Sequence, residues 1–266
     1  MMGNTTRKRA ILASALLAIT GLFASALPAQ AAEVGVTAKE IKLGITSPLS
    51  GRVAAVYGKV PGAMNAYFQH VNANGGVYGR SIKLISKDDA YLPTSAVAQT
   101  NQLILKDKVF AIVGALGTAN HLAALRSTNL SGRGIPDLFV NTGFSGFADP
   151  KKYKTTFAVL PSYRMEAKIM AKYIKDNLPG KKIALIVQDD DFGIDAAAGF
   201  AQAGLTFEKT IKFPVGRDTA ADAQGWITNT LKPANIDLAI VFATTSTTAA
   251  LLGTSAALGY RPTSGW

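Results

Sequence analysis

Hydrophobic residues recur along this chain at two spacings, that of a strand and that of a helix, and segments of the two kinds alternate. Ile41, Leu43 and Ile45 alternate with polar or small residues, as in a strand with two different faces. The segment 60–71 then repeats its apolar residues at helical spacing. The same succession continues to residue 141, with predicted strands at 81–86, 110–113 and 137–141 and predicted helices at 94–107 and 118–129.

The rhythm breaks between residues 142 and 162, where glycine, proline and lysine replace the periodic pattern. A second succession follows, with strands predicted at 183–187, around 207–213 and at 238–242, and helices between them. Strand–helix alternation favours parallel sheets with right-handed crossovers. We therefore predict an α/β fold of two doubly wound lobes. The predicted segments are a first lobe at 33–144, an inter-lobe passage at 145–162 and a second lobe at 163–266.

The first 31 residues have the pattern of a secretory signal peptide. Arg7, Lys8 and Arg9 precede the apolar segment 11–27, and Ala29-Gln30-Ala31 is a small-x-small cleavage site. This pattern predicts a signal peptide over 1–31 and a periplasmic location for the rest of the chain. The alternative is an uncleaved N-terminal anchor.

Charge and cysteine content narrow the function further. Without the first 31 residues, 25 basic and 17 acidic residues give a net charge of +8, and the chain has no cysteine. The basic residues are dispersed, whereas proteins that read nucleic acid concentrate them with stacking aromatics. We expect no nucleic-acid partner, no thiolate chemistry and a monomer, with a positive field that favours anionic ligands.

Candidate binding residues follow the predicted strands, because parallel sheets bind ligands at the carboxyl ends of their strands. Thr118 stands where a predicted strand meets a helix, so its hydroxyl and the helix amides can bind an anion. The alternative is that Thr118 only caps its helix. The segment 114–118 has neither the spacing of a dinucleotide fingerprint nor the lysine of a phosphate loop.

Catalytic and metal-binding patterns are weak. Asp88-Asp89 are adjacent and do not face one substrate, and Asp189-Asp190-Asp191 lacks the spacing of a calcium loop, so helix capping is the simpler interpretation. His121 follows Thr118 and is interpreted as either a ligand contact or a helix-surface residue. We predict no catalytic residue, no metal site and no cofactor.

Several short motifs, taken in order, resemble those of the type I periplasmic solute-binding proteins of ABC importers, the branched-chain amino-acid-binding family. The resemblance runs from about residue 41 to 266. The motifs are Ile41–Gly51, Gly75-Gly76-Val77-Tyr78-Gly79-Arg80, Asp88-Asp89, Ile112-Val113-Gly114 and Ile135-Pro136.

The resemblance implies two lobes joined by three crossing strands, with a solute in the cleft between them and a membrane permease as partner. It implies that Thr118 binds the solute carboxylate, that Phe192 closes over the solute, and that Thr244 stands where another tyrosine often lies. The remaining residues that it implies for the site are Ala119, Phe144, Ser145, Tyr57 and Tyr163.

Two departures from the family bear on function. The segment Asn141-Thr142-Gly143-Phe144 is more similar to relatives that take aromatic or other organic acids. Family members are also longer, so we expect a C-terminally truncated fold that binds weakly or not at all. The expected function is capture of a small organic carboxylate, either a branched-chain amino acid or an aromatic or other organic acid. The alternatives are a truncated, non-binding relic and an exported enzyme that uses the Asp-rich loops.

Overall fold

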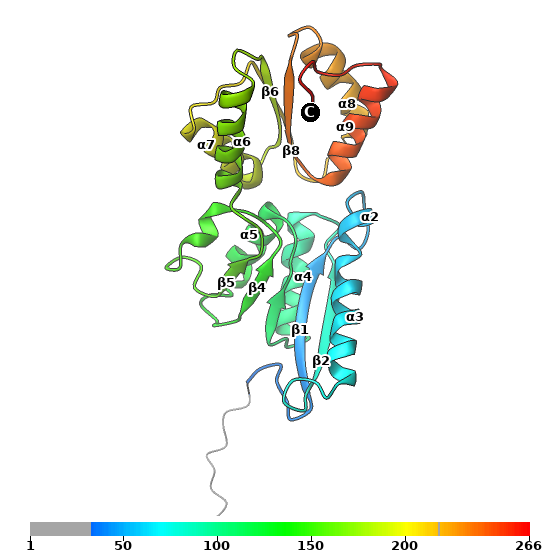
Figure 1. The fold of residues 1–266 in the computed structure, drawn as a ribbon. Coiled ribbons are helices and arrows are strands. Elements are labelled where there is room, and N and C mark those ends of the chain that lie inside the picture. The colour runs from blue at the N-terminus through cyan, green and yellow to red at the C-terminus, as the bar shows by residue number, and fades with distance from the viewer. Residues whose placement is uncertain (1–32, 218) are drawn as a thin grey trace, which may run out of the picture. The chain divides into compact units, whose positions relative to one another are not determined.

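The computed structural model describes residues 33–217 and 219–266. The predicted signal peptide, 1–31, lies outside the described residues. Across the described ranges, none of the helices combines the length and the apolar character needed to cross a membrane. Residues 34–266 form one unit that contains two parallel sheets (Figure 1).

The first sheet has five parallel strands in the order β2-β1-β3-β4-β5. Ile112 in β3 packs into a core with α4 and α5, whereas its neighbours Ala111 and Val113 face α3. Helices therefore lie on both faces of this sheet, which is the predicted doubly wound arrangement. The elements are β1 (Glu40–Ser47), α2 (Ala54–Tyr57), α3 (Val60–Ala73), β2 (Ser81–Asp88), α4 (Pro93–Leu105), β3 (Ala111–Val113), α5 (Thr118–Thr128), β4 (Asp137–Val140), the 3₁₀ helix η1 (Ser145–Ala148) and β5 (Thr156–Ala158).

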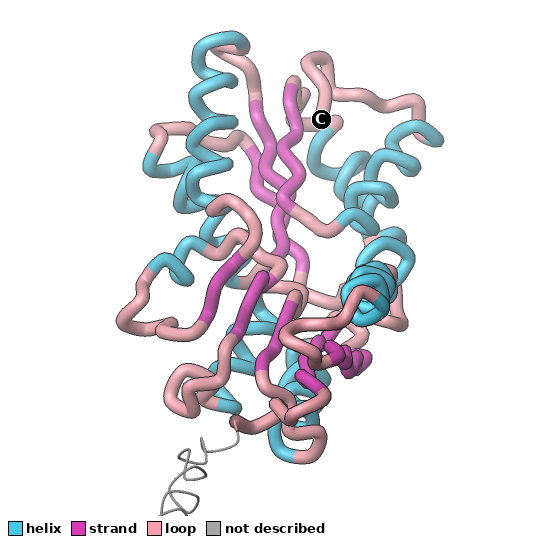
Figure 2. The backbone as a smooth tube through the Cα atoms, turned by 60° about the horizontal axis from the view of Figure 1, so that its bottom comes forward, coloured by secondary structure: helices cyan, strands magenta, loops and turns pink. Residues whose placement is uncertain are grey.

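The second sheet has three parallel strands in the order β7-β6-β8, with helices on both sides (Figures 1 and 2). In β6, Ile183, Leu185 and Val187 pack toward α6 and α7, and Ala184 and Ile186 pack toward α8, η2 and α9. Burial on both faces explains why β6 is continuously apolar. The elements are α6 (Tyr163–Asn177), β6 (Ile183–Gln188), α7 (Asp191–Gln202), β7 (Lys209–Phe213), α8 (Ala220–Trp226), the π-helical turn η2 (Ile227–Leu231), β8 (Leu238–Phe242) and α9 (Thr245–Ala257).

The predicted passage 145–162 is more ordered than its sequence indicates. It contains η1 and also β5, which joins the edge of the first sheet by pairing with β4. Its three residues, Thr156-Phe157-Ala158, show neither sustained alternation nor the continuous apolar run that marks β3, so the pattern did not reveal it. The chain then crosses to the second lobe through residues 159–162. Two α/β lobes are confirmed, while the boundaries at 144 and 163 stay a prediction.

The last residues of the chain lie beside β8. Gly265 forms a parallel bridge with Leu238, and the Ser264 N–H donates to the Asp237 carbonyl at 2.6 Å. The segment after α9 therefore begins to pair with the edge of the second sheet, where the sequence pattern leads one to expect a further strand.

On its α3 side, the first sheet carries an open apolar hollow of about 610 Å³. Its walls come from α3, β1, β2, β3, β4 and Phe110, and Phe139 at its edge is 61% exposed. This hollow is separate from the carboxyl ends of the strands.

Candidate functional site

Loops at the carboxyl ends of strands from both sheets line two adjoining cavities. The smaller one, named here the Thr118 cavity, measures about 70 Å³, and the larger one, the Arg52 cavity, about 270 Å³. Tyr91 and Thr244 line both, so the two cavities are neighbours. The Thr118 cavity is lined by Tyr57, Tyr91, Leu116, Gly117, Thr118, Asn141, Leu160, Tyr163, Phe192, Ala243 and Thr244.

Thr118 is the first residue of α5, and Gly117 is the N-cap. Gly117 has a φ of 94°, and a Cβ atom there would lie 2.8 Å from the Tyr91 ring, so the position requires glycine. The Gly117 N–H donates to the Asn141 carbonyl at 3.3 Å, and the hydroxyls of Thr118 and Thr142 share a hydrogen bond of 2.6 Å. The prediction that Thr118 only caps its helix is wrong, because its hydroxyl is bound to a neighbouring strand end.

Tyr163, at the start of α6, brings a further hydroxyl to this pair. Its phenol lies close enough to Thr142 and Thr118 to interact with their side chains, and its N–H donates to the Gly143 carbonyl at 2.7 Å. Burial raises the pKa of Tyr163, so its phenol stays protonated at neutral pH. Three hydroxyls therefore meet beside the first N–H groups of α5, which have no acceptor within the helix. Donors of this kind at a helix N-terminus suit a carboxylate.

An aromatic wall faces the same cavity. The Phe192 ring lies 4.5 Å from the Tyr163 ring and 5.7 Å from the Phe242 ring, measured between centroids. Phe192 is held at the first turn of α7 by Asp190, whose Oδ1 accepts hydrogen bonds from the N–H groups of Phe192 and Gly193 at 3.0 and 3.4 Å. The wall gives the cavity an apolar side next to its hydroxyl side, as small-molecule sites generally have.

Tyr91 and Gln188 connect the loops of the two lobes. The Tyr91 side chain is 7% exposed and interacts with the Gln188 side chain, and burial raises the pKa of this phenol. The Gln188 amide in turn donates to Asp190 Oδ2 at 2.6 Å, and burial raises the pKa of Asp190. The cap of α7 is thereby connected to the first lobe.

The Arg52 cavity contains two arginines in its lining. Arg52 and Arg217 lie on its wall, and Arg217 donates to both carboxylate oxygens of Asp222 at 2.8 and 2.9 Å. A volume of about 270 Å³ is close to the lower end of the range for ligand pockets. The other lining residues include Val53, Leu92, Gln188, Phe213, Pro214, Ser246 and Thr247.

The structure brings five of the eight predicted ligand-binding residues together around the Thr118 cavity. They are Tyr57, Thr118, Tyr163, Phe192 and Thr244. Ala119, Phe144 and Ser145 are not part of the lining of either cavity. The Ser145 N–H and hydroxyl both donate to Asp195, and the Phe144 ring packs against Phe147. Ligand contact by any of the eight stays a prediction.

Tyr91, Asn141 and Gln188 line the cavities without having been named as ligand contacts. All three lie at the carboxyl ends of predicted strands, where ligands are expected, but nothing in their own local sequence singles them out as ligand contacts. For Tyr91 one signal was available, since it lies only two residues after the adjacent carboxylates Asp88 and Asp89.

The aspartates proposed for catalysis have structural partners instead. Asp88 accepts hydrogen bonds from Leu49 N–H, Ser50 N–H and Ala90 N–H at 2.8–3.2 Å and from the Ser50 hydroxyl at 2.5 Å. Asp89 is fully buried, and its Oδ1 accepts from Tyr91 N–H at 2.9 Å. These bonds shape two loops of the first lobe that contribute Gly51, Ala90 and Tyr91 to the Arg52 cavity, and the catalytic alternative gains no support from them.

The second aspartate group behaves as predicted for a cap. Asp190 is the N-cap of α7, whereas Asp189 pairs at the surface with Lys212 at 3.3 Å. Over the described residues, no group of three or more His, Cys, Asp or Glu side chains could hold a metal ion.

His121 occupies neither of the two predicted environments. His121 is 3% exposed, and its Nε2 lies 2.7 Å from Asp137 Oδ2. The imidazole ring packs against the Phe147 ring in a T-shaped arrangement. The helix-surface interpretation is therefore wrong, and His121 also lies outside the lining of both cavities. His121 instead forms a buried polar pair with Asp137 in the first lobe.

Comparison with known proteins agrees with this architecture. The family profile described as "Periplasmic binding protein" matches residues 40–264. A curated relative, "Leu/Ile/Val-binding protein homolog 7" of Brucella suis biovar 1 (strain 1330), is 26% identical over 208 residues, which are 74% of this chain and 50% of the relative. The chain thus spans about half the length of the curated relatives that it matches.

Two solved structures show the same fold. A branched-chain amino acid ABC transporter protein from Thermus thermophilus with bound valine superposes with a TM-score of 0.70 at 18% identity, covering 85% of this chain and 59% of the other. A solute-binding protein of an ABC transporter from Rhodopseudomonas palustris BisB5 in complex with 3,4-dihydroxybenzoic acid gives 0.66 at 24% identity, covering 83% and 59%. With its two parallel sheets and a family profile that matches most of its length, the chain belongs to the periplasmic binding protein family and has the type I fold.

Proposed function

We propose that this protein is the extracytoplasmic solute-binding component of an ABC importer, and that it captures a small organic carboxylate between its two lobes. The observation that supports the proposal most is the convergence of Thr118, Thr142 and Tyr163 hydroxyls beside the N-terminus of α5. The donors come from both lobes, so a solute that binds them favours closure of the lobes. Family membership supports a periplasmic location and a membrane permease as partner.

The size of the Thr118 cavity indicates which part of the solute it takes. About 70 Å³ is little more than the volume of two water molecules, which suits a carboxylate group and not a whole solute. Since Tyr91 and Thr244 also line the Arg52 cavity, the rest of the solute can extend into that larger space. The aromatic rings of Phe192 and Tyr163 favour a planar or branched apolar body.

Two solute classes are candidates. Solved relatives of this fold include one with bound valine and one in complex with 3,4-dihydroxybenzoic acid. The described lining of the two cavities includes hydroxyls, amides and arginines but no carboxylate. An aromatic or other organic acid needs no carboxylate, whereas an α-amino acid has an ammonium group to satisfy. We propose an organic acid as the first candidate and a branched-chain amino acid as the second.

A thermal-shift screen of the purified chain tests the proposal. The panel contains 3,4-dihydroxybenzoate, 4-hydroxybenzoate, valine, leucine and isoleucine, with the corresponding methyl esters or amides, which lack the carboxylate, as controls. A ligand at 100 times its dissociation constant stabilises the folded state by about 2.7 kcal/mol, so a carboxylate that binds raises Tm while its ester or amide does not. Equal shifts for the acids and for their esters or amides would contradict carboxylate recognition.

A further inference from the structure

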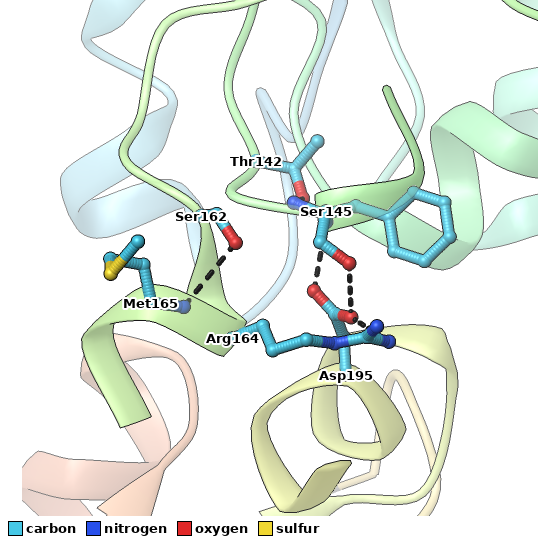
Figure 3. A network of polar contacts seen from close by, with 7 residues as sticks. Thr142, Ser145, Ser162, Arg164, Met165 and Asp195 are labelled. Atoms are coloured by element: carbon cyan, nitrogen blue, oxygen red, sulfur yellow. Dashed lines mark hydrogen bonds and ion pairs between the residues drawn. The ribbon is translucent and has the colours of Figure 1, made fainter. Parts of the chain in front are cut away.

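A polar network near the crossing between the two lobes joins Ser145, Arg164 and Asp195, none of which lines either cavity (Figure 3). Asp195 lies on α7 of the second lobe and its side chain is 1% exposed. Its Oδ2 accepts the Ser145 N–H at 2.8 Å, and its Oδ1 accepts the Ser145 hydroxyl at 2.5 Å and lies 2.8 Å from Arg164 Nη2. One carboxylate therefore holds a first-lobe loop and a second-lobe arginine at the same time.

The network connects two segments that both carry residues of the Thr118 cavity. Ser145 lies three residues after Thr142, whose hydroxyl pairs with Thr118 and also accepts the Phe144 N–H at 3.2 Å. Asp195 lies three residues after Phe192, so both are on one side of the first turns of α7. Moving Asp195 relative to Ser145 therefore moves the aromatic wall relative to the hydroxyl pair.

The backbone around this network is closely packed. A Cβ atom on Gly143 would lie 2.3 Å from the Pro161 carbonyl oxygen and 2.8 Å from the Tyr163 ring. The segment leaving β4 and the segment entering α6 therefore run side by side, and the Tyr163 N–H donates to the Gly143 carbonyl. Within the described residues, the chain crosses between the sheets only once, at 159–162. Polar contacts next to that crossing are thus well placed to fix the angle between the lobes.

We propose that Asp195 is a positioning residue for the solute site: through its bonds to Ser145, it sets the angle between the lobes and keeps Phe192 opposite the Thr118–Thr142 pair. Burial makes these charge-assisted hydrogen bonds stronger than exposed ones. The proposal goes beyond solute capture and holds whatever the solute is. Arg164 places a positive charge next to the buried Asp195 carboxylate, at 2.8 Å from Oδ1.

Distance measurements between the lobes, made without any solute, test the proposal directly. Because the chain has no cysteine, Ala66→Cys on α3 and Ala256→Cys on α9 give two labelling sites at exposed alanines, one in each lobe. Double electron–electron resonance on the full chain then records the distribution of distances between the labels. Asp195→Asn removes the charge and is expected to broaden this distribution and shift its mean, relative to the labelled parent.

Matched variants separate positioning from general loss of structure. Asp189→Asn removes a carboxylate from the same lobe that pairs at the surface with Lys212 at 3.3 Å, and it is expected to leave the distribution unchanged. Ser145→Ala should broaden the distribution less than Asp195→Asn, because the backbone N–H bond remains, and Ser145→Thr should restore the parent distribution. If Asp195→Asn does not fold, the comparison of Ser145→Ala with Ser145→Thr tests the proposal instead. A parent-like distribution for Asp195→Asn in folded protein, or for Ser145→Ala if the first variant unfolds, would overturn the proposal.

Discussion

At the scale of single residues, the candidate site depends on hydroxyl groups whose partners come from other segments of the chain. Thr118 was predictable as a candidate because it follows a strand at the start of a helix. Its bond to Thr142 and its contact with Tyr163 were not predictable, because they depend on how β4 and α6 are placed. The sequence around Asp89 is likewise that of an ordinary loop, and only the complete burial of this carboxyl in the folded protein makes it unusual.

Thr118→Val should weaken solute binding and leave the fold intact. A hydrogen bond to a charged group contributes about 1.5–3 kcal/mol, so the affinity should fall by roughly ten- to a hundredfold. Isothermal titration with the best ligand of the thermal-shift screen measures the change. Thr128→Val is the matched control, since Thr128 is a buried threonine at the other end of α5 whose hydroxyl donates to the Ala124 carbonyl. An equal loss of affinity in both variants would contradict a direct role for Thr118.

Asp89→Asn should alter the pH dependence of stability. Burial raises the pKa of Asp89 from 3.8 to about 6, the nearby Asp88 charge acts in the same direction, and the Tyr91 N–H opposes it. The folded protein therefore holds a proton that the unfolded chain releases, so ionisation lowers the free energy of unfolding as the pH rises from about 4 to about 6. The variant lacks this penalty, and its stability relative to the parent should rise over that window by up to about 3 kcal/mol.

Urea unfolding at pH 4.5 and pH 7 measures the Asp89 effect. Asp237→Asn is the control, because hydrogen bonds from the Thr263 hydroxyl and the Lys182 N–H lower the pKa of Asp237, and this carboxylate lies at the start of β8 and not beside Asp89. Its titration lies below this window, so its effect on stability should be nearly the same at both pH values. If the Asp89→Asn difference is also independent of pH, Asp89 is ionised normally in the folded protein.

At the scale of elements, the sequence predicted every strand of the two sheets except β5. Strands β1, β2, β6 and β8 and helices α3 to α5 lie where their apolar residues place them, and the short β3 was recognisable as a continuous apolar run. The four-residue α2 and η1 and the three-residue β5 were missed, because such short segments cannot repeat a period and tertiary contacts determine them. The contact of Ser145 was also not predictable from local sequence. The family resemblance implies that Ser145 lies at the solute, whereas in the structure its hydroxyl donates to Asp195.

Helix α7 shows how an element positions a site residue, and Asp190 is its test. Asp190→Ala removes the acceptor of two N–H groups and the partner of Gln188, so it should lower the free energy of unfolding by about 1–2 kcal/mol. Asp190→Asn keeps a capping oxygen and should lose less. Asp191→Ala, one residue further along, removes only a charge in the first turn and should lose about 0.3–1 kcal/mol. Urea unfolding of the three variants checks the order, and a reversed order would contradict the capping role.

At the scale of the whole molecule, contacts between residues from both lobes define the site. The Tyr91–Gln188 contact and the Ser145–Asp195 bonds join segments far apart in sequence, and no local pattern predicts them. The α/β fold, in contrast, follows from strand–helix alternation, because β–α units bury their apolar faces on a parallel sheet, and the break at 142–162 separates the two lobes. The apolar hollow beside α3 is a second place where an apolar compound could bind, and it must be separated from the cleft experimentally.

Amide chemical-shift mapping tests the central claim most directly, because it detects weak binding and locates it. ¹⁵N-labelled protein is titrated with 3,4-dihydroxybenzoate and, separately, with valine. We predict saturable shifts at Thr118, Tyr163, Phe192 and Thr244 for at least one of them, and their loss in Thr118→Val but not in Thr128→Val. Shifts confined to the hollow around Tyr67 and Phe139, or no saturable shift with either compound, would contradict capture of a carboxylate in the cleft.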